Sequence, residues 1–320
     1  MQPVPEQPAL HMTAMLIYGG INMSEMILTT HGLTKRYGSH TVVDQISLNI
    51  RKGAIYGLVG RNGAGKTTFM KMICNLANAS AGSYELCGIS CAEVGNLIET
   101  PGFYERLSAF DNLRAKAELY GGRSAEELHA IIELVGLKKA GKKPAGKFSL
   151  GMLQRLGIGI ALIGDPKLLV LDEPINGLDP TGVAEVRSTL HRLNTERGVT
   201  ILISSHILGE LSKLATDYGF IEKGVLIREI TQEQLLNECA DSVRLTVDRP
   251  DDAARYLNEI GITQITMLDS GALKLLQCND RTAEITALLV QKGIAVYEIC
   301  KQGIDLEEYY LNMIGKKDRG

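Results

Sequence analysis

GRNGAGKT, residues 60–67, decides how this chain folds. It follows AIYGLVG (54–60), a short and nearly all-apolar stretch that is typical of a buried strand. It precedes FMKMICNLA (69–77), whose apolar residues recur at helical spacing. A strand, a glycine-rich loop and a helix in this order form a phosphate-binding loop. The octet fits the spacing G-x-x-x-x-G-K-[ST], so its backbone amides are expected to surround a phosphate at the start of the helix.

Two residues of the loop and two later acids have expected roles in nucleotide chemistry. Lys66 would reach the β- and γ-phosphates, and the Thr67 hydroxyl would bind Mg²⁺. Asp172 and Glu173 end the apolar strand LLVLDEP (168–174), where Asp172 would face the metal and Glu173 would polarise a water for attack on the γ-phosphate. ATP and Mg²⁺ are therefore the predicted cofactors. The predicted nucleotide-binding residues of the loop are Gly60, Asn62, Gly63, Ala64, Gly65, Lys66, Thr67 and Thr68.

The composition is that of an ordinary globular protein. The 320 residues are enough for one large and one small domain. Hydrophobic residues make up 45% and the formal net charge is −3, so no overall basic field indicates nucleic-acid binding. Only Cys87 and Cys91 lie close among six scattered cysteines, which favours reduced thiols over a disulfide framework or a metal site. The sequence has no run of 18 apolar residues, so no membrane-spanning helix is expected.

The pattern divides the chain into three expected regions. Residues 1–22 carry no ordered pattern and make a poor signal peptide, so a flexible extension is expected there. Residues 23–230 form the expected large domain, with alternating antiparallel strands at 26–50 and a mostly helical segment at about 99–163. Residues 231–320 follow the order β-α-β-β-α-β, which suggests a small two-layer domain of the ferredoxin-like kind.

With its glycine-rich loop and the strand that ends in Asp172 and Glu173, the chain resembles the ATP-binding subunits of ABC transporters. The resemblance covers about residues 26–230, and the motifs follow the family's order. The resemblance implies an α/β fold, a P-loop NTPase of ABC type. Such a fold has a mixed-sheet core, an antiparallel β edge and a helical subdomain, followed here by a small C-terminal α+β domain. The resemblance also implies further nucleotide-contacting residues, namely Tyr37, Ser149, Gly151, Asp179 and His206.

These residues take their expected roles from the positions they match. Tyr37 stands where the family stacks an aromatic ring on adenine. FSLGMLQR (148–155) stands where the family has its Leu-Ser-Gly-Gly-Gln signature, and Ser149 and Gly151 match while their three neighbours depart. Ser149 is expected to cap the following helix and to hold a phosphate there. An exposed strand tyrosine and an ordinary capped helix are the alternatives.

Two further motifs complete the family's set. Asp179, in NGLDP (176–180), resembles an aspartate that reaches across a dimer interface. His206 follows an apolar strand and matches the family's switch histidine, which contacts the γ-phosphate. A structural strand-end histidine is the alternative. The predicted catalytic residues are Glu173, His206 and Lys66.

The resemblance implies two protein partners and a location. Two ATP-binding subunits would pair head to tail as a homodimer, so that Lys66 of one and Ser149 of the other close on the same ATP. The permease would be a separate integral-membrane polypeptide, which places this chain in the cytoplasm, peripheral on the inner face of the cell membrane. A nucleic-acid partner is not expected.

NLIETPGFYERL (96–107) narrows the family to one branch. Most members of the family place a glutamine where Glu99 stands. In those members the glutamine links the Mg²⁺ site to the permease. A carboxylate still binds Mg²⁺ but accepts hydrogen bonds only, so Glu99 is predicted as a metal-site residue beside Thr67 and Asp172. The alternative is a surface glutamate at a helix entry. Glu99, the altered signature and the small C-terminal domain together resemble the bacitracin and lantibiotic self-resistance type.

We therefore expect an ATP-hydrolysing subunit that powers export of a peptide antibiotic or a similar compound. A general multidrug exporter, or one of unknown substrate, is the alternative because the permease mainly chooses the substrate. A soluble ABC-type ATPase acting on ribosomes or DNA is less favoured, since such relatives usually carry two cassettes or a long coiled coil. Intact Glu173 and His206 disfavour a regulator that binds nucleotide without turnover.

Overall fold

The computed structural model describes residues 25–239, 242–268, 271–276, 278–302 and 306–315. Contacts group these residues into two units. The first unit comprises the described residues up to His206 together with Gly219–Glu229, and the second comprises Ile207–Tyr218 and the described residues from Ile230 onward. The extension expected at residues 1–22 lies outside the described residues.

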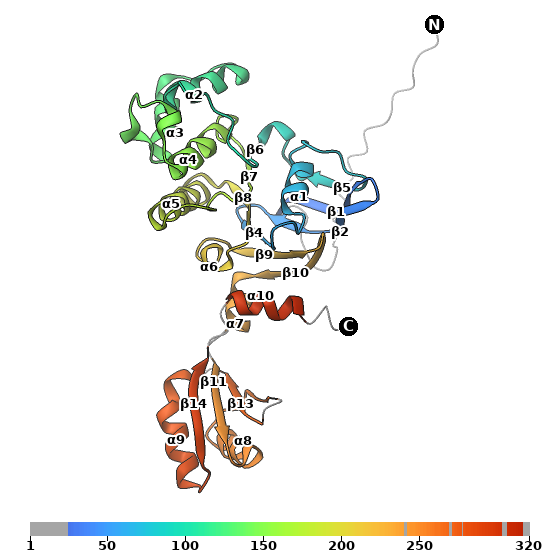
Figure 1. The fold of residues 1–320 in the computed structure, drawn as a ribbon, viewed down its shortest axis with the longest axis vertical. Coiled ribbons are helices and arrows are strands. Elements are labelled where there is room, and N and C mark those ends of the chain that lie inside the picture. The colour runs from blue at the N-terminus through green and yellow to red at the C-terminus, as the bar shows by residue number, and fades with distance from the viewer. Residues whose placement is uncertain (1–24, 240–241, 269–270, 277, 303–305, 316–320) are drawn as a thin grey trace. The chain divides into compact units, whose positions relative to one another are not determined.

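An antiparallel sheet begins the first unit (Figure 1). Its strands are β1 (Met26–Tyr37), β2 (His40–Ile46), β3 (Asn49–Arg51) and β5 (Ala81–Leu86). Strand β1 is central, because it pairs antiparallel with each of the other three. The antiparallel β edge predicted from the alternating sequence is confirmed.

A six-stranded sheet in the order β10-β9-β4-β8-β7-β6 forms the centre of the fold. Its strands are β4 (Ile55–Val59), β6 (Val94–Leu97), β7 (Leu168–Leu171), β8 (Thr200–Ser205), β9 (Asp217–Glu222) and β10 (Val225–Thr231). Strands β4, β8, β7 and β6 run parallel to one another. Every residue of β4, β7 and β8 is buried, as expected for parallel strands covered on both faces.

Five α-helices belong to the first unit: α1 (Lys66–Ile73), α2 (Ala109–Ala117), α3 (Ala125–Leu134), α4 (Leu150–Ala161) and α5 (Pro180–Arg197). Helices α2, α3 and α4 pack on one another and lie together in Figure 1, in the segment predicted to be mostly helical. Local signals set where they begin. Ser108 caps α2, and Ser124 forms a capping box with Glu127 at the start of α3.

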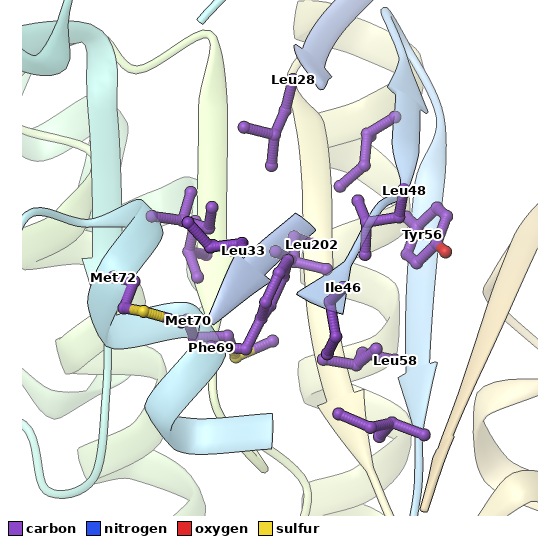
Figure 2. Close-up of a cluster of buried hydrophobic side chains, with 14 of the residues drawn as sticks. Leu28, Leu33, Ile46, Leu48, Tyr56, Leu58, Phe69, Met70, Met72 and Leu202 are labelled. Carbon is purple, nitrogen blue, oxygen red and sulfur yellow. The ribbon is translucent and has the colours of Figure 1, made fainter. Parts of the chain in front are cut away.

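Helix α1 is fixed by the hydrophobic core beneath it (Figure 2). Phe69 and Met70 of α1 are fully buried in one cluster with Leu58 of β4 and Leu202 of β8. Because this cluster holds the helix against the ends of the parallel strands, the loop that precedes α1 has a fixed place at the sheet edge.

From β11 onward, the second unit has the element order predicted from the sequence. Strands β11 (Ser242–Val247), β12 (Ile265–Met267), β13 (Leu273–Leu276) and β14 (Val296–Gln302) form one antiparallel sheet in the order β12-β13-β11-β14. Its helices are α6 (Leu208–Leu211), α7 (Gln232–Glu238), α8 (Pro250–Glu259), α9 (Thr282–Gln291) and α10 (Leu306–Gly315). The series β11-α8-β12-β13-α9-β14 has the β-α-β-β-α-β order of a ferredoxin-like fold, and the bounds predicted for this domain stay a prediction.

In the part of the chain that the structure describes, no helix is both long and apolar enough to cross a membrane.

Replacing Phe69 by alanine tests the anchoring of α1. We expect Phe69→Ala to lower the free energy of unfolding by about 3–5 kcal/mol, because it leaves a cavity in a closed core. Urea unfolding followed by circular dichroism measures this. Leu76→Ala is the control, since Leu76 is 59% exposed and its loss is expected to change the free energy by less than about 0.5 kcal/mol. Equal effects of the two variants would contradict the anchoring role.

Candidate active site

The candidate site lies where four parallel strands end. The loop from Gly60 follows β4, Asp172 and Glu173 follow β7, His206 follows β8, and Glu99 comes two residues after β6. Because parallel strands present their carboxyl ends at one edge of a sheet, these segments from distant parts of the sequence share one edge.

The glycine-rich loop forms a hollow at the start of α1. Gly63 and Gly65 have φ angles of 80° and 103°, a region that favours glycine, and a Cβ on Gly65 would lie 2.6 Å from the carbonyl oxygen of Val42. A cavity of about 190 Å³ is lined by Val42, Asn62, Gly63, Ala64, Gly65, Lys66, Thr67, Thr68 and Glu173. Gly65 caps α1 without a side chain, so the first helical amides face this hollow, an arrangement that binds phosphate.

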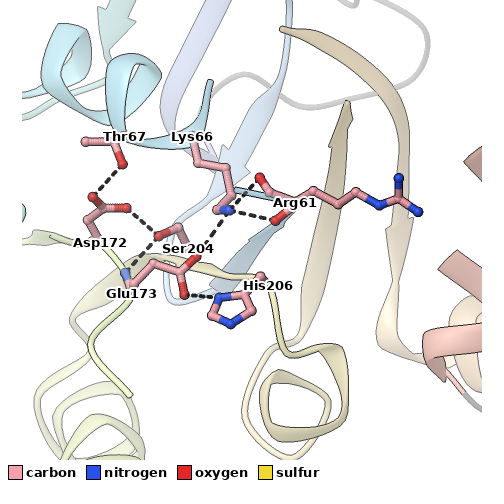
Figure 3. Close-up of polar contacts among 8 residues, drawn as sticks. Arg61, Lys66, Thr67, Asp172, Glu173, Ser204 and His206 are labelled. Atoms are coloured by element: carbon pink, nitrogen blue, oxygen red, sulfur yellow. Dashed lines mark hydrogen bonds and ion pairs between the residues drawn. The ribbon is translucent and has the colours of Figure 1, made fainter. Parts of the chain in front are cut away.

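The carboxylate of Asp172 is held from both sides by hydroxyl groups (Figure 3). Thr67 Oγ1 donates to Asp172 Oδ2 at 2.7 Å, and Ser204 Oγ donates to Asp172 Oδ1 at 2.6 Å. The amide of Glu173 donates in turn to Ser204 Oγ at 2.8 Å. Asp172 is 7% exposed and Ser204 is fully buried, so this orientation is fixed inside the protein.

Ser204 is a site residue that the sequence analysis did not single out. It belongs to the stretch VTILISS (199–205), where two serines end an otherwise apolar run. A buried hydroxyl at the end of a parallel strand needs a partner, and the acid that ends the neighbouring strand supplies it. A serine and an acid that end two successive apolar strands were therefore the sequence signal for this contact.

Glu173 lies between the lysine and the histidine of the predicted catalytic set (Figure 3). Its Oε1 forms an ion pair with Lys66 Nζ at 3.1 Å, and its Oε2 lies 2.8 Å from His206 Nδ1. Lys66 Nζ also donates to the carbonyl oxygens of Gly60 at 2.6 Å and Arg61 at 3.2 Å. The Lys66 contact lacks hydrogen-bond geometry, so the buried Oε1 accepts no hydrogen bond from the described residues. This carboxylate is placed to act as a general base.

The signature residues and Asp179 begin two neighbouring helices. The Ser149 hydroxyl accepts from the amide of Met152, which is the cap expected for α4, and Asp179 caps α5 by accepting from the amide of Gly182 at 3.0 Å. A Cβ on Gly151 would lie 3.5 Å from the Cα of Gly182, so the two helices approach closely there. Within the described part of the chain, none of these residues lines the cavity at the glycine-rich loop.

Tyr37 and Glu99 lie at the margins of the site. Tyr37 ends β1 with 54% of its surface exposed, and the Lys35 ammonium lies 4.9 Å from its ring centroid. Glu99 has a left-handed backbone with a φ of 64°, and its Oε1 accepts a hydrogen bond from Lys71 Nζ at 2.6 Å. Lys71 stands one helical turn after Thr67 and was not among the residues predicted from the sequence.

The donor set fits ATP with a divalent cation. Thr67 and Asp172 place hydroxyl and carboxylate oxygens 2.7 Å apart beside the hollow of backbone amides, and hard cations such as Mg²⁺ prefer oxygen ligands. The hollow, with Lys66 at its wall, fits a polyphosphate.

Comparison with known proteins supports the same class. The family described as "ABC transporter" matches residues 43–176. Over 300 residues the chain is 40% identical to the bacitracin transport ATP-binding protein BcrA of Enterococcus faecalis, covering 91% of this chain and 97% of that protein. It is 43% identical over 208 residues to the lantibiotic transport ATP-binding protein SrtF of Streptococcus pyogenes, covering 63% and 90% of the two chains.

A solved structure described as the ATP binding subunit of an ABC transporter is 27% identical, with a TM-score of 0.58. The similarity covers 66% of this chain and 92% of that one. The fold and the phosphate-binding loop thus define an ATP-binding cassette. The chain belongs to the ABC transporter family, as one of its ATP-binding subunits. The predictions of an ABC-type ATPase subunit and of a resemblance to the bacitracin and lantibiotic type are confirmed.

Replacing Ser204 by alanine tests how the Asp172 carboxylate is held. Ser204→Ala leaves Asp172 Oδ1 and the Glu173 amide without their shared hydroxyl, and a hydrogen bond to a charged group is worth about 1.5–3 kcal/mol. We expect Mg²⁺-dependent ATP binding to weaken by about 10- to 100-fold in isothermal titration calorimetry. Ser83→Ala, on exposed strand β5, is the control and is expected to bind as wild type. Wild-type affinity in Ser204→Ala would show that the hydroxyl is dispensable.

Proposed function

We propose that this chain hydrolyses ATP to power the export of a peptide antibiotic of the bacitracin or lantibiotic kind through a separate permease. The observation that carries the proposal is the carboxylate of Glu173, placed between Lys66 and His206 at the mouth of the phosphate-binding loop. The substrate class is supported by relatives whose names specify bacitracin or lantibiotic transport, one of them similar over nearly its full length.

Nucleotide binding uses the loop and the residues that follow β7. The backbone amides at the start of α1 and the ammonium of Lys66 bind the phosphates. Thr67 and Asp172 hold Mg²⁺, which when bound neutralises charge on the phosphate oxygens. Ser204 keeps Asp172 oriented, so the metal ligands require little rearrangement. Tyr37 offers its exposed ring to the adenine.

Lys66 connects phosphate binding to the general base. The Lys66 ammonium is shared between Glu173 and the loop carbonyls of Gly60 and Arg61. A phosphate in the loop competes for that ammonium, which leaves Glu173 Oε1 able to accept a proton from an attacking water. His206 holds Oε2 and so fixes the direction of the carboxylate. Phosphate binding in the loop thus makes Glu173 available as the general base.

A second copy of the chain completes the site in this proposal. Ser149, Gly151 and Asp179 lie at the starts of α4 and α5, outside the cavity that their own chain forms. In a head-to-tail homodimer these residues face the nucleotide of the partner, where the capped start of α4 adds further phosphate-binding amides.

The permease is proposed to dock on the helical segment after Glu99. A groove of about 370 Å³ there is lined by Gly102, Phe103, Tyr104, Asn112, Ala115, Lys116, Leu119 and Ile160. Tyr104 and Leu119 are 65% and 76% exposed, so the groove offers apolar contact area to a partner. Asn112 bonds both backbone groups of Tyr104 and so holds the wall of the groove in shape. We propose that the chain docked in this way is peripheral on the cytoplasmic face of the membrane.

Replacing Glu173 by glutamine tests the proposed chemistry. We expect Glu173→Gln to keep ATP binding and to lower hydrolysis by at least about 100-fold, because an amide cannot take a proton from water. Phosphate release and nucleotide titration measure the two effects. Glu196→Gln, on the exposed side of α5, is the control and is expected to hydrolyse ATP normally. Normal hydrolysis by Glu173→Gln would overturn the mechanism.

The same variant tests the substrate class in cells. Produced with its permease in a susceptible host, the wild type is expected to raise the inhibitory concentration of bacitracin or a lantibiotic, and Glu173→Gln is not. Protection against unrelated drugs alone would favour the general multidrug alternative.

A charge placed in the groove tests permease docking. We expect Leu119→Arg to abolish co-purification with the permease, because docking would bury an unpaired charge. ATP binding by the isolated subunit is expected to remain. Leu76→Arg introduces the same charge at an exposed leucine outside the groove and is expected to leave the complex intact. A stable complex with Leu119→Arg would place the permease elsewhere.

A further inference from the structure

An ion pair between Lys71 and Glu99 stands next to the site and has no part in the function proposed above. The Lys71 ammonium donates to Glu99 Oε1 at 2.6 Å. The two side chains are 32% and 62% exposed, so the pair is accessible to solvent and is not locked by packing. An exposed pair of this kind can open without disturbing the core.

Helix geometry places Lys71 beside the metal ligands. Lys71 follows Thr67 by one helical turn, so the two side chains share a face of α1. Thr67 bonds Asp172 from that face. The pKa of the Lys71 ammonium is raised, chiefly by its hydrogen bond to Glu99. Lys71 thus lies on the face of α1 that carries the proposed metal ligand Thr67.

Strand register places Glu99 in a position equivalent to Glu173. Leu97 of β6 pairs with Leu171 of β7, and the amide of Asp172 donates to the Leu97 carbonyl at 2.9 Å. Glu99 and Glu173 each come two residues after these paired leucines, and their φ angles are 64° and 48°. A left-handed backbone is uncommon for residues with a side chain, and such residues gather at functional sites. Two neighbouring strands therefore deliver matched glutamates to one edge.

Negative charge at this edge favours a positive partner for Glu99. Asp172 and Glu173 already bring two carboxylates to a site that binds polyphosphate, and a glutamate at position 99 adds a third. Lys71 supplies a positive charge at that position, and it leaves Lys66 available for Glu173 and the phosphates.

We propose that Lys71 is the positioning residue of Glu99: its ammonium holds the carboxylate against α1 and competes with the divalent cation for it. The inference rests on the proposed function, since the competing cation is the one proposed at Thr67 and Asp172. A divalent cation held by Thr67 and Asp172 would compete with the Lys71 ammonium for the Glu99 carboxylate.

Mn²⁺ binding tests this competition without measuring activity. Mn²⁺ affinity is measured by electron paramagnetic resonance on the full chain, saturated with a non-hydrolysable ATP analogue in physiological salt, where distant charges are screened. We expect Lys71→Met to tighten Mn²⁺ binding by about two- to fivefold, the factor that corresponds to an exposed ion pair. Glu99→Gln is expected to weaken it.

The double variant separates a specific partner from a general charge effect. With Glu99→Gln already present, Lys71→Met is expected to leave Mn²⁺ affinity unchanged, because no carboxylate remains to compete for. Lys71→Arg is expected to restore wild-type affinity. Lys138→Met, which breaks an exposed 3.0 Å pair with Glu133 elsewhere, is the control and is expected to have no effect.

The proposal would be overturned if Lys71→Met changed Mn²⁺ affinity equally with Glu99 and with Gln at position 99. It would also be overturned if Lys71→Met changed the affinity in neither background, or if Lys71→Arg did not have wild-type affinity. These outcomes differ from failure of the proposed function, in which the wild type itself binds no Mn²⁺–nucleotide and hydrolyses no ATP.

Discussion

The buried carboxylate of Asp172 is the interaction on which the site depends. An ionised group inside a protein is tolerated only with partners, and Asp172 takes one hydroxyl from Thr67 on α1 and one from Ser204 on β8. These partners come from opposite sides of the carboxylate and from distant parts of the chain. The acid therefore ties the phosphate-binding helix to the sheet at the point where the metal ligands must meet.

Local patterns were enough to predict much of this arrangement. The glycine loop, the strand that ends in Asp172 and Glu173, and the cap at Ser149 each depend on a few adjacent residues, so their signals survive in the sequence. The parallel strands were predictable because their apolar runs alternate with helices. The order of elements in the C-terminal unit was predictable for the same reason.

Partners that depend on strand register were not predictable in this way. Ser204 reaches Asp172 because β8 and β7 pair in one alignment, and a shift of one residue would turn the hydroxyl to the other face. Lys71 meets Glu99 only because α1 packs beside the exit of β6. For Glu99 the sequence indicated a role near the metal, but it contained no sign that a lysine one turn after Thr67 holds the side chain.

The close approach of α4 and α5 has a mechanical consequence. At Gly151 and Gly182 the two helices touch with hardly more than backbone between them, and Arg155 of α4 pairs with Glu185 of α5 at 2.8 Å. The side chain of Leu178 also packs against both glycines, so the contact is closely filled. We therefore expect the first turns of α4 and α5 to move together. A displacement of the helical subdomain would then move the start of α5 together with Ser149.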